Sequence, residues 1–300
     1  MNKVVLVGMG NVGASYAYSL INQKTSIDEL VLIDINKDKV LGDLLDLNHG
    51  LVLTESKIKL KHGDYSDCVD ADIVIIAAGA NQKENETRLD LLNKNSKIVK
   101  EITENVVKSG FKGIFLIATN PVDIMTYVVR KYSNFSSNKV IGTGTMLDTA
   151  RLKYYLSQRL RINSNNINAY VLGEHGDSSF VLWSKAHAGV IAINNLLSSD
   201  DKDIIETEVK RAAYKIINYK GETSFAVAEC LVKLTEAIFN DENVIYPISA
   251  PVNDIYIGMP SVINKNGIKG VIKVNFTKEE EEKYNKSYKI LKDTISKMEE

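Results

Sequence analysis

Cysteine and proline are scarce in this chain of 300 residues, which contains two cysteines and four prolines. The cysteines, Cys68 and Cys230, lie far apart and form no C-x-x-C pair, so neither a disulfide framework nor a zinc knuckle is indicated. No Cys/His ligand pair follows Asn120, where related folds place a metal, and we therefore expect no metal site. Such cysteine usage is typical of a reducing compartment.

Long hydrophobic runs are also missing. The apolar run that follows Met1-Asn2-Lys3 covers only residues 4–7, far too few for a signal h-region or a membrane span. The net charge is -1, and no basic block is interleaved with aromatic residues. We expect a cytoplasmic protein with neither a membrane nor a nucleic-acid partner. The charge run 278–283 is typical of a solvated helix start.

The chain does contain enough apolar sequence, 44% of its residues, for a large core. Its first apolar run leads directly into a glycine turn, Gly8-Met9-Gly10-Asn11-Val12-Gly13, which is followed by a helical pattern over residues 14–21. A strand, a G-x-G-x-x-G turn and a helix in this order let the backbone approach a pyrophosphate at the helix N-terminus. This context predicts a dinucleotide site.

Asp34 ends a second strand, residues 30–33, roughly 20 residues after the turn, where the dinucleotide fingerprint places a carboxylate. Such a carboxylate accepts hydrogen bonds from the ribose hydroxyls and repels a 2′-phosphate. The sequence therefore favours NAD over NADP, although a turn-capping aspartate is the alternative interpretation of Asp34.

Apolar segments at residues 58–60, 73–77 and 113–118 are typical of further buried parallel strands, and strands alternate with helices as far as Gly142. This alternation predicts an α/β fold, a doubly wound parallel sheet of about six strands over residues 1–143. Asn120 follows the last of these segments, at the edge where open sheets bind ligands.

A polar segment, residues 81–88, follows the strand that ends at Gly79 and Ala80. It is too long for a tight turn and leads into a helical pattern. It is therefore a candidate lid that carries Arg88 to and from a cofactor crevice, and an ordinary surface loop is the alternative.

The second half, residues 144–300, reads as a mixed α+β substrate domain. Asp148 and Arg151 stand three apart in a helical pattern, so they share one face and either pair with each other or act together in one pocket. His175 lies between two glycines just after the strand-like segment 167–172. A loop histidine that titrates near neutral pH is a natural proton donor and acceptor, although most loop histidines are merely solvated.

Five motifs, in this order and at this spacing, together resemble the lactate/malate dehydrogenase family over essentially the whole chain. They are the glycine turn with Asp34, the loop 82–88, and the segments 118–123, 147–151 and 173–177. The resemblance implies a Rossmann-type first domain, NAD as cofactor and the reversible NADH-dependent reduction of pyruvate to L-lactate, as in fermentative glycolysis.

The resemblance also implies a role for each matching residue. His175 matches the acid/base histidine, Asp148 the carboxylate that orients it, and Arg151 the arginine that holds the substrate carboxylate, so that Asp148 and Arg151 serve neighbouring parts of one site rather than each other. Arg88 matches the loop arginine that polarises the reacting carbonyl. Asn120 and Thr223 match residues of the substrate site. Cofactor contacts are implied for Gly8, Met9, Gly10, Val12, Gly13, Asp34, Lys39, Gly79, Ala80, Thr119 and Asn120.

Gln82 decides the expected substrate. This position carries glutamine in lactate dehydrogenases and arginine in malate dehydrogenases, and a neutral amide suits the methyl end of pyruvate. A bulkier 2-hydroxy acid is the first alternative, because the segment 178–183 departs from the sequence that commonly follows the histidine in lactate dehydrogenases. A dinucleotide-binding protein without turnover is the second.

Regulation and assembly are implied less directly. Many bacterial relatives bind fructose 1,6-bisphosphate through an arginine and a histidine at positions that carry Lys153 and Asn168 here. Lysine lacks the bidentate fork and asparagine carries no charge, so we expect weak or absent activation. The resemblance implies a homotetramer. The segment 246–256 is shorter than expected in bacterial relatives, which leaves the local hairpin open.

Overall fold

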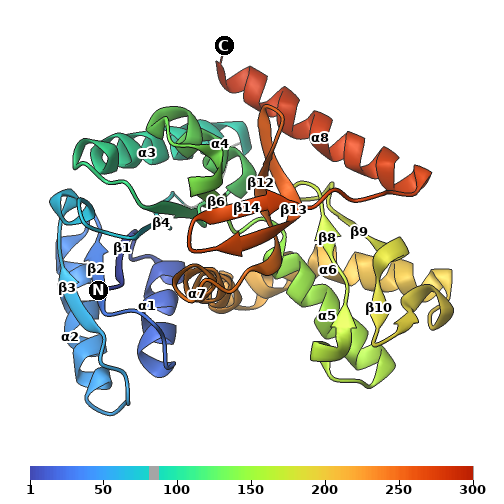
Figure 1. Ribbon diagram of the computed structural model, residues 1–300, viewed down its shortest axis with the longest axis horizontal. Helices are drawn as coiled ribbons and strands as arrows, with labels where there is room; N and C mark the ends of the chain where they lie inside the picture. The colour runs from blue at the N-terminus through green and yellow to red at the C-terminus, as the bar shows by residue number, and fades with distance from the viewer. Residues whose placement is uncertain (81–87, 300) are drawn as a thin grey trace.

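The computed structural model describes the backbone of residues 1–80 and 88–299. Its centre is one sheet in which six strands run parallel and three antiparallel strands extend one edge (Figure 1). The parallel strands are, in spatial order, β3 (Lys59–His62), β2 (Glu29–Ile33), β1 (Lys3–Val7), β4 (Ile73–Ile76), β5 (Ile114–Ile117) and β6 (Val140–Gly142).

Helices connect these strands and cover both faces of the sheet (Figure 1). The spatial order 3-2-1-4-5-6 reverses direction between β1 and β4, which is the doubly wound arrangement, and this confirms the predicted fold class. The crevice at such a reversal lies at the carboxyl ends of the strands, so this edge positions the site. The connecting helices are α1 (Asn11–Asn22), α2 (Lys37–Leu51), α3 (Arg88–Lys108) and α4 (Val122–Ser133).

The antiparallel strands belong to the second half of the chain but join the first half's sheet. They are β12 (Val244–Val252), β13 (Ile255–Asn264) and β14 (Gly267–Val271), and β12 meets β6 where Ser249 pairs with Gly142. A Cβ at Gly142 would lie 2.8 Å from that of Ser249, so only glycine permits this approach. The hairpin joins the two halves of the chain in one sheet.

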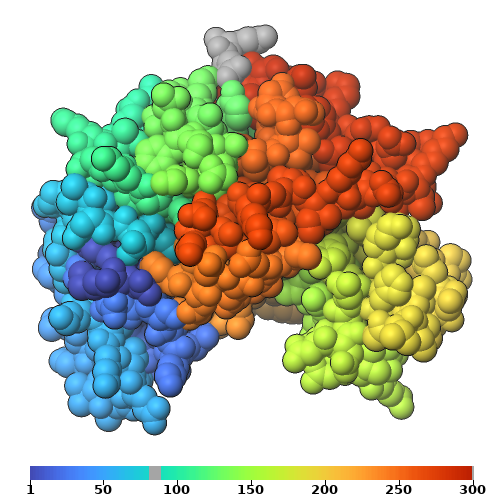
Figure 2. All heavy atoms as spheres, viewed as in Figure 1, coloured from blue at the N-terminus to red at the C-terminus, as the bar shows by residue number. Residues whose placement is uncertain are grey.

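A second, smaller core includes Leu152, Val171 and Val209. It belongs to a lobe that contains α5 (Met146–Leu160), α6 (Ser199–Lys220) and the short strands β7 (Ile167–Asn168), β8 (Val171–Leu172), β9 (Phe180–Val181), β10 (His187–Ala188) and β11 (Ile191–Ala192). The helices α7 (Phe225–Phe239) and α8 (Lys278–Glu299) pack against the main core instead. In the space-filling view, a hollow separates the smaller lobe from α1 and α7 (Figure 2).

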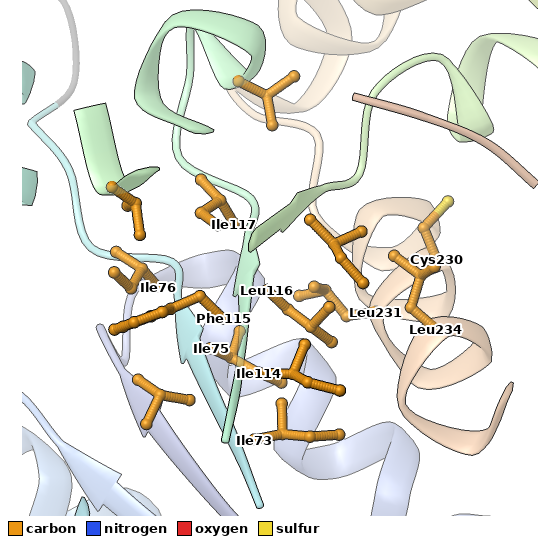
Figure 3. Packing of buried hydrophobic residues seen from close by; sticks show 14 of the residues in the cluster. Ile73, Ile75, Ile76, Ile114, Phe115, Leu116, Ile117, Cys230, Leu231 and Leu234 are labelled. Carbon is orange, nitrogen blue, oxygen red and sulfur yellow. The ribbon is translucent and has the colours of Figure 1, made fainter. Parts of the chain in front are cut away.

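The main core lies on both faces of the parallel strands. Along β5, Ile114 and Leu116 point towards Leu231 of α7, whereas Phe115 points to the opposite face (Figure 3). Full burial of each such side chain stabilises the fold by about 1.5–3 kcal/mol. The second half of the chain therefore supplies, through α7, part of the core that packs on the parallel strands.

The charge run at the start of α8 is not simply solvated. Glu280 is only 6% exposed, and its carboxylate accepts hydrogen bonds from the backbone N–H groups of Ser184 (2.9 Å) and Thr277 (3.0 Å). Burial raises the pKa of this carboxyl, but the hydrogen bonds outweigh burial and lower it. The expected solvated helix start is thus wrong at this position. Across the described residues, no helix is long and apolar enough to cross a membrane.

Candidate functional site

The glycine turn between β1 and α1 is built for close backbone approach. Gly8 has φ +108°, and a Cβ there would lie 2.3 Å from the backbone nitrogen of Ala78. A Cβ at Gly13 would lie 2.0 Å from the carbonyl oxygen of Gly8, whereas one at Gly10 would meet nothing within 4 Å. Gly10 caps α1 without a side-chain hydrogen bond. The turn therefore presents the first backbone N–H groups of α1 to a ligand, as a pyrophosphate requires.

Asp34 lies at the end of β2 and faces this turn. Its carboxylate accepts hydrogen bonds from the backbone N–H of Met9 (2.7 Å) and of Asn36 (2.9 Å). The two bonds fix the side chain beside the turn while leaving acceptor capacity for ribose hydroxyls. The residues present therefore fit a dinucleotide. Lys39, by contrast, forms an ion pair with Asp43 (2.5 Å), and its contact with a cofactor stays a prediction.

The loops that follow β4 and β5 are tied together by Asn95 of α3. Its side chain accepts a hydrogen bond from the backbone N–H of Ala80 (2.8 Å) and donates one to the carbonyl of Asn120 (2.9 Å). The hydroxyl of Thr119 donates to the carbonyl of Ala78 (2.7 Å). Residues predicted to contact the cofactor and the substrate are thus brought to one edge, and Asn95 is a link that sequence reasoning missed.

His175, Asp148 and Arg151 form one hydrogen-bonded group. The Nδ1 atom of His175 lies 2.6 Å from Oδ2 of Asp148, and Nη1 of Arg151 donates to Oδ1 of the same carboxylate at 2.9 Å. Asp148 and Arg151 therefore do pair with each other, contrary to the expectation that they would serve only neighbouring parts of the site. The pairing uses one of the five guanidinium N–H donors, so the others can still bind a carboxylate.

Burial and charge act in opposite directions on this group. Burial lowers the pKa of His175, but the Asp148 charge, the hydrogen bond to it and the charge of Asp123 outweigh burial and raise the pKa above 6.5. Burial raises the pKa of Asp148, but His175 and Arg151 together outweigh burial, so the pKa of this carboxyl lies below its ordinary value. An ionised Asp148 thus stabilises a protonated imidazole, which is the state of a proton donor.

A cavity of about 600 Å³ opens beside His175. Sequence reasoning placed Asn120 and His175 in such a site but missed the contributions of α3, α6 and α8, which come from positions far apart in the chain. Only side-chain packing reveals them. The lining residues are Leu91, Asn120, Pro121, Glu174, His175, Gly176, Asp177, Ser178, Tyr214, Lys286 and Ile290.

The other predicted residues lie elsewhere or cannot be placed. Gln82 lies outside the described residues, and of Arg88 only the backbone is described, as the first residue of α3. Thr223 is half-buried between α6 and α7. Lys153 lines a separate cavity of about 490 Å³, and burial lowers the pKa of its ammonium group. Asn168 is exposed on β7.

Family profiles match both halves of the chain. The profile described as lactate/malate dehydrogenase, NAD binding domain, covers residues 2–142, and the profile described as lactate/malate dehydrogenase, alpha/beta C-terminal domain, covers residues 145–300. Together with the glycine turn and Asp34, the first profile confirms NAD as the expected cofactor. The fold and this edge of the sheet define an NAD-binding dehydrogenase, and the chain belongs to the lactate/malate dehydrogenase family.

Individual relatives agree over nearly the full length. The L-lactate dehydrogenase of Borrelia turicatae is 49% identical over 99% of this chain and 98% of that protein, and the one of a Geobacillus strain is 47% identical over 99% and 97%. A lactate dehydrogenase from a Medee basin deep-sea metagenome library superposes with a TM-score of 0.97, at 46% identity over 100% of this chain and 99% of that one.

Proposed function

We propose that this chain is an NAD-dependent L-lactate dehydrogenase that reversibly reduces pyruvate, with His175 as the acid/base group. One observation carries the proposal. The imidazole of His175 is held by Asp148, and the same carboxylate holds Arg151, so a proton donor and a carboxylate-binding group stand together beside the NAD crevice.

In the proposed reaction, the carboxylate of pyruvate binds the guanidinium of Arg151. Protonated His175 donates its Nε2 proton to the keto oxygen, and Asp148 stabilises the imidazolium until that transfer occurs. Bound NADH supplies the hydride to the carbonyl carbon. The products are L-lactate, NAD⁺ and neutral His175, and lactate oxidation runs through the same steps in reverse.

Gln82 and Arg88 complete the proposal from the sequence. Arg88 polarises the reacting carbonyl, and the neutral amide of Gln82 accommodates the methyl group of pyruvate. Oxaloacetate would bring a second carboxylate without a countercharge, which costs several kcal/mol in a desolvated site. Thr223, Asn120 and the residues of the glycine turn retain the substrate and cofactor roles implied above.

A broader 2-hydroxy-acid dehydrogenase is the second candidate. The cavity beside His175 measures about 600 Å³, and Leu91 and Ile290 give it apolar walls. Such walls suit a branched side chain as well as a methyl group, because a few methylenes change binding by only about 1–3 kcal/mol each.

The test measures NADH oxidation with pyruvate, oxaloacetate and 2-oxoisocaproate in parallel. We expect kcat/KM to be highest for pyruvate, and Gln82→Arg to shift the preference towards oxaloacetate by at least ~100-fold, since it supplies the missing countercharge. A preference for 2-oxoisocaproate would favour the second candidate. NADH binding without turnover of any of the three would leave only a non-catalytic dinucleotide-binding protein.

We further propose a homotetramer of two-domain subunits, with the boundary between residues 143 and 144, in the cytoplasm. Exposed apolar side chains on α2, Leu41 (45%) and Leu45 (61%), support assembly through that helix.

The free thiols Cys68 and Cys230 fit a reducing compartment. Activation by fructose 1,6-bisphosphate should be weak or absent. Compared with an arginine and a histidine at these positions, Lys153 lacks the bidentate guanidinium and Asn168 lacks a positive charge.

A further inference from the structure

Asp123 lies in the first turn of α4, three residues after Asn120, and is only 2% exposed. Its Oδ2 atom accepts a hydrogen bond from the backbone N–H of His175 at 2.7 Å, and its Oδ1 atom accepts one from the hydroxyl of Ser249 at 2.5 Å. This single carboxylate therefore joins the cofactor edge of the first half, the hairpin strand β12 and the loop that carries the proposed acid/base group.

The loop is held through three successive backbone N–H groups. That of Gly173 bonds to the carbonyl of Gly258 (3.0 Å), and that of Glu174 bonds to the hydroxyl of Ser287 (2.6 Å). The third, that of His175, bonds to Asp123, which is the one charged acceptor of the three. Asp148 thus fixes the imidazole ring of His175, and Asp123 fixes the main chain of His175 relative to Asn120.

The charge of Asp123 does not serve the stability of the fold. Burial raises the pKa of its carboxyl to about 6, although the hydrogen bonds from Ser249 and His175 act in the opposite direction. A folded-state pKa above the ordinary 3.8 means that stability from this group falls as the pH rises from about 4 to about 6. At neutral pH, an amide would accept the same backbone hydrogen bond without a buried charge.

We propose that Asp123 is a positioning residue for His175. Its carboxylate fixes the main chain of His175 relative to the Asn120 end of α4, and its negative charge stabilises the protonated imidazole. The inference rests on the proposed acid/base role of His175. Among the described side chains, the charged and titratable groups that face this imidazole are Asp148 and Arg151 from α5 and Asp123 from α4, and Glu174, Asp177, Tyr214 and Lys286 line the same cavity.

The test compares Asp123→Asn with the unaltered chain in kcat/KM for pyruvate from pH 5 to pH 9, at saturating NADH. Below about pH 6, where Asp123 is itself protonated, we expect the two curves to agree within ~2-fold. Above that pH, the alkaline inflection should move down by roughly 0.5–1 unit, which lowers kcat/KM about 3- to 10-fold. The thermal midpoint of Asp123→Asn at pH 7.5 should equal or exceed that of the unaltered chain.

Ser249→Ala is the matched control, because it removes the other hydrogen bond to the carboxylate and keeps the carboxyl group. It should lower the thermal midpoint, and since loss of this bond raises the pKa of Asp123 without removing its carboxyl, it should move the alkaline inflection less than Asp123→Asn does. A uniform loss at every pH in Asp123→Asn, an unmoved inflection, or an equal shift in Ser249→Ala would overturn the proposal. Turnover by His175→Gln at the unaltered rate would instead overturn the acid/base role itself, which distinguishes the two failures.

Discussion

The carboxylate of Asp148 uses each of its oxygens for a different task. Oδ2 holds Nδ1 of His175, and Oδ1 holds Nη1 of Arg151, and the carboxylate side chain is only 10% exposed. Breaking one member of a buried charged group leaves the others unpaired, which typically costs about 3–5 kcal/mol. Substitutions here should therefore affect both activity and stability, and conservative variants are the informative ones.

Arg151→Lys keeps the charge but loses the planar fork. Since a lysine ammonium cannot bind a carboxylate in the two-pronged geometry, we expect KM for pyruvate to rise roughly 100-fold, with a smaller change in kcat. Arg159→Lys is the matched control, because Arg159 lies on the same helix, is 56% exposed and pairs with Asp201 on the surface. KM values within twofold of each other for the two variants would contradict the role of Arg151.

At the scale of elements, α8 comes from the far end of the chain and reaches the loop that carries His175. It packs against β13, α4 and β9, and the fully buried hydroxyl of Ser287 accepts the backbone N–H of Glu174 (Figure 1). A Cβ at Gly173 would lie 2.7 Å from this hydroxyl, so glycine and serine fit each other. The helix therefore helps to fix the loop on which His175 lies.

Ser287→Ala should leave the N–H of Glu174 without its partner. A buried unsatisfied donor costs about 1–3 kcal/mol, and we expect a loss of this size in the free energy of unfolding, together with reduced kcat. Ser296→Ala changes an exposed serine on the same helix and should alter the free energy of unfolding by less than ~0.5 kcal/mol. Denaturant titration measures both, and equal losses would show that α8 does not act through this contact.

At the scale of the whole molecule, local pattern predicted the parallel sheet and nonlocal packing completed it. The strands around Gly8, Asp34 and Asn120 follow from apolar runs and turn chemistry, which a single sequence displays. Local sequence patterns cannot show that Ser249 approaches Gly142, or that Glu280 is buried against Ser184. Each of these contacts joins segments that lie about a hundred residues apart in the chain. The roles of His175, Asp148 and Arg151 came from resemblance, and the pairing between the last two needed coordinates.

Allosteric activation is a property of the assembled molecule. Lys153 carries only a point charge, and burial lowers the pKa of its ammonium group, while Asn168 carries no charge. The positions of Lys153 and Asn168 should therefore bind a sugar bisphosphate poorly. We expect the pyruvate saturation curve to change less than twofold in half-saturating concentration when fructose 1,6-bisphosphate is added. Strong sharpening of the curve would refute this, and Lys153→Arg with Asn168→His should introduce a response if the site is otherwise intact.

The most direct test of the central claim is the pH dependence of kcat/KM for pyruvate in the unaltered chain and in Asp148→Asn. In the proposed mechanism, pyruvate reduction needs protonated His175, whose pKa is raised above 6.5, so kcat/KM should be level below that pKa and fall tenfold per pH unit above it. Removing the Asp148 charge should move the inflection to lower pH by at least ~1 unit and reduce the plateau. An inflection at the same pH in both proteins would contradict the account, because it would show that His175 and Asp148 do not act as one proton-donating pair.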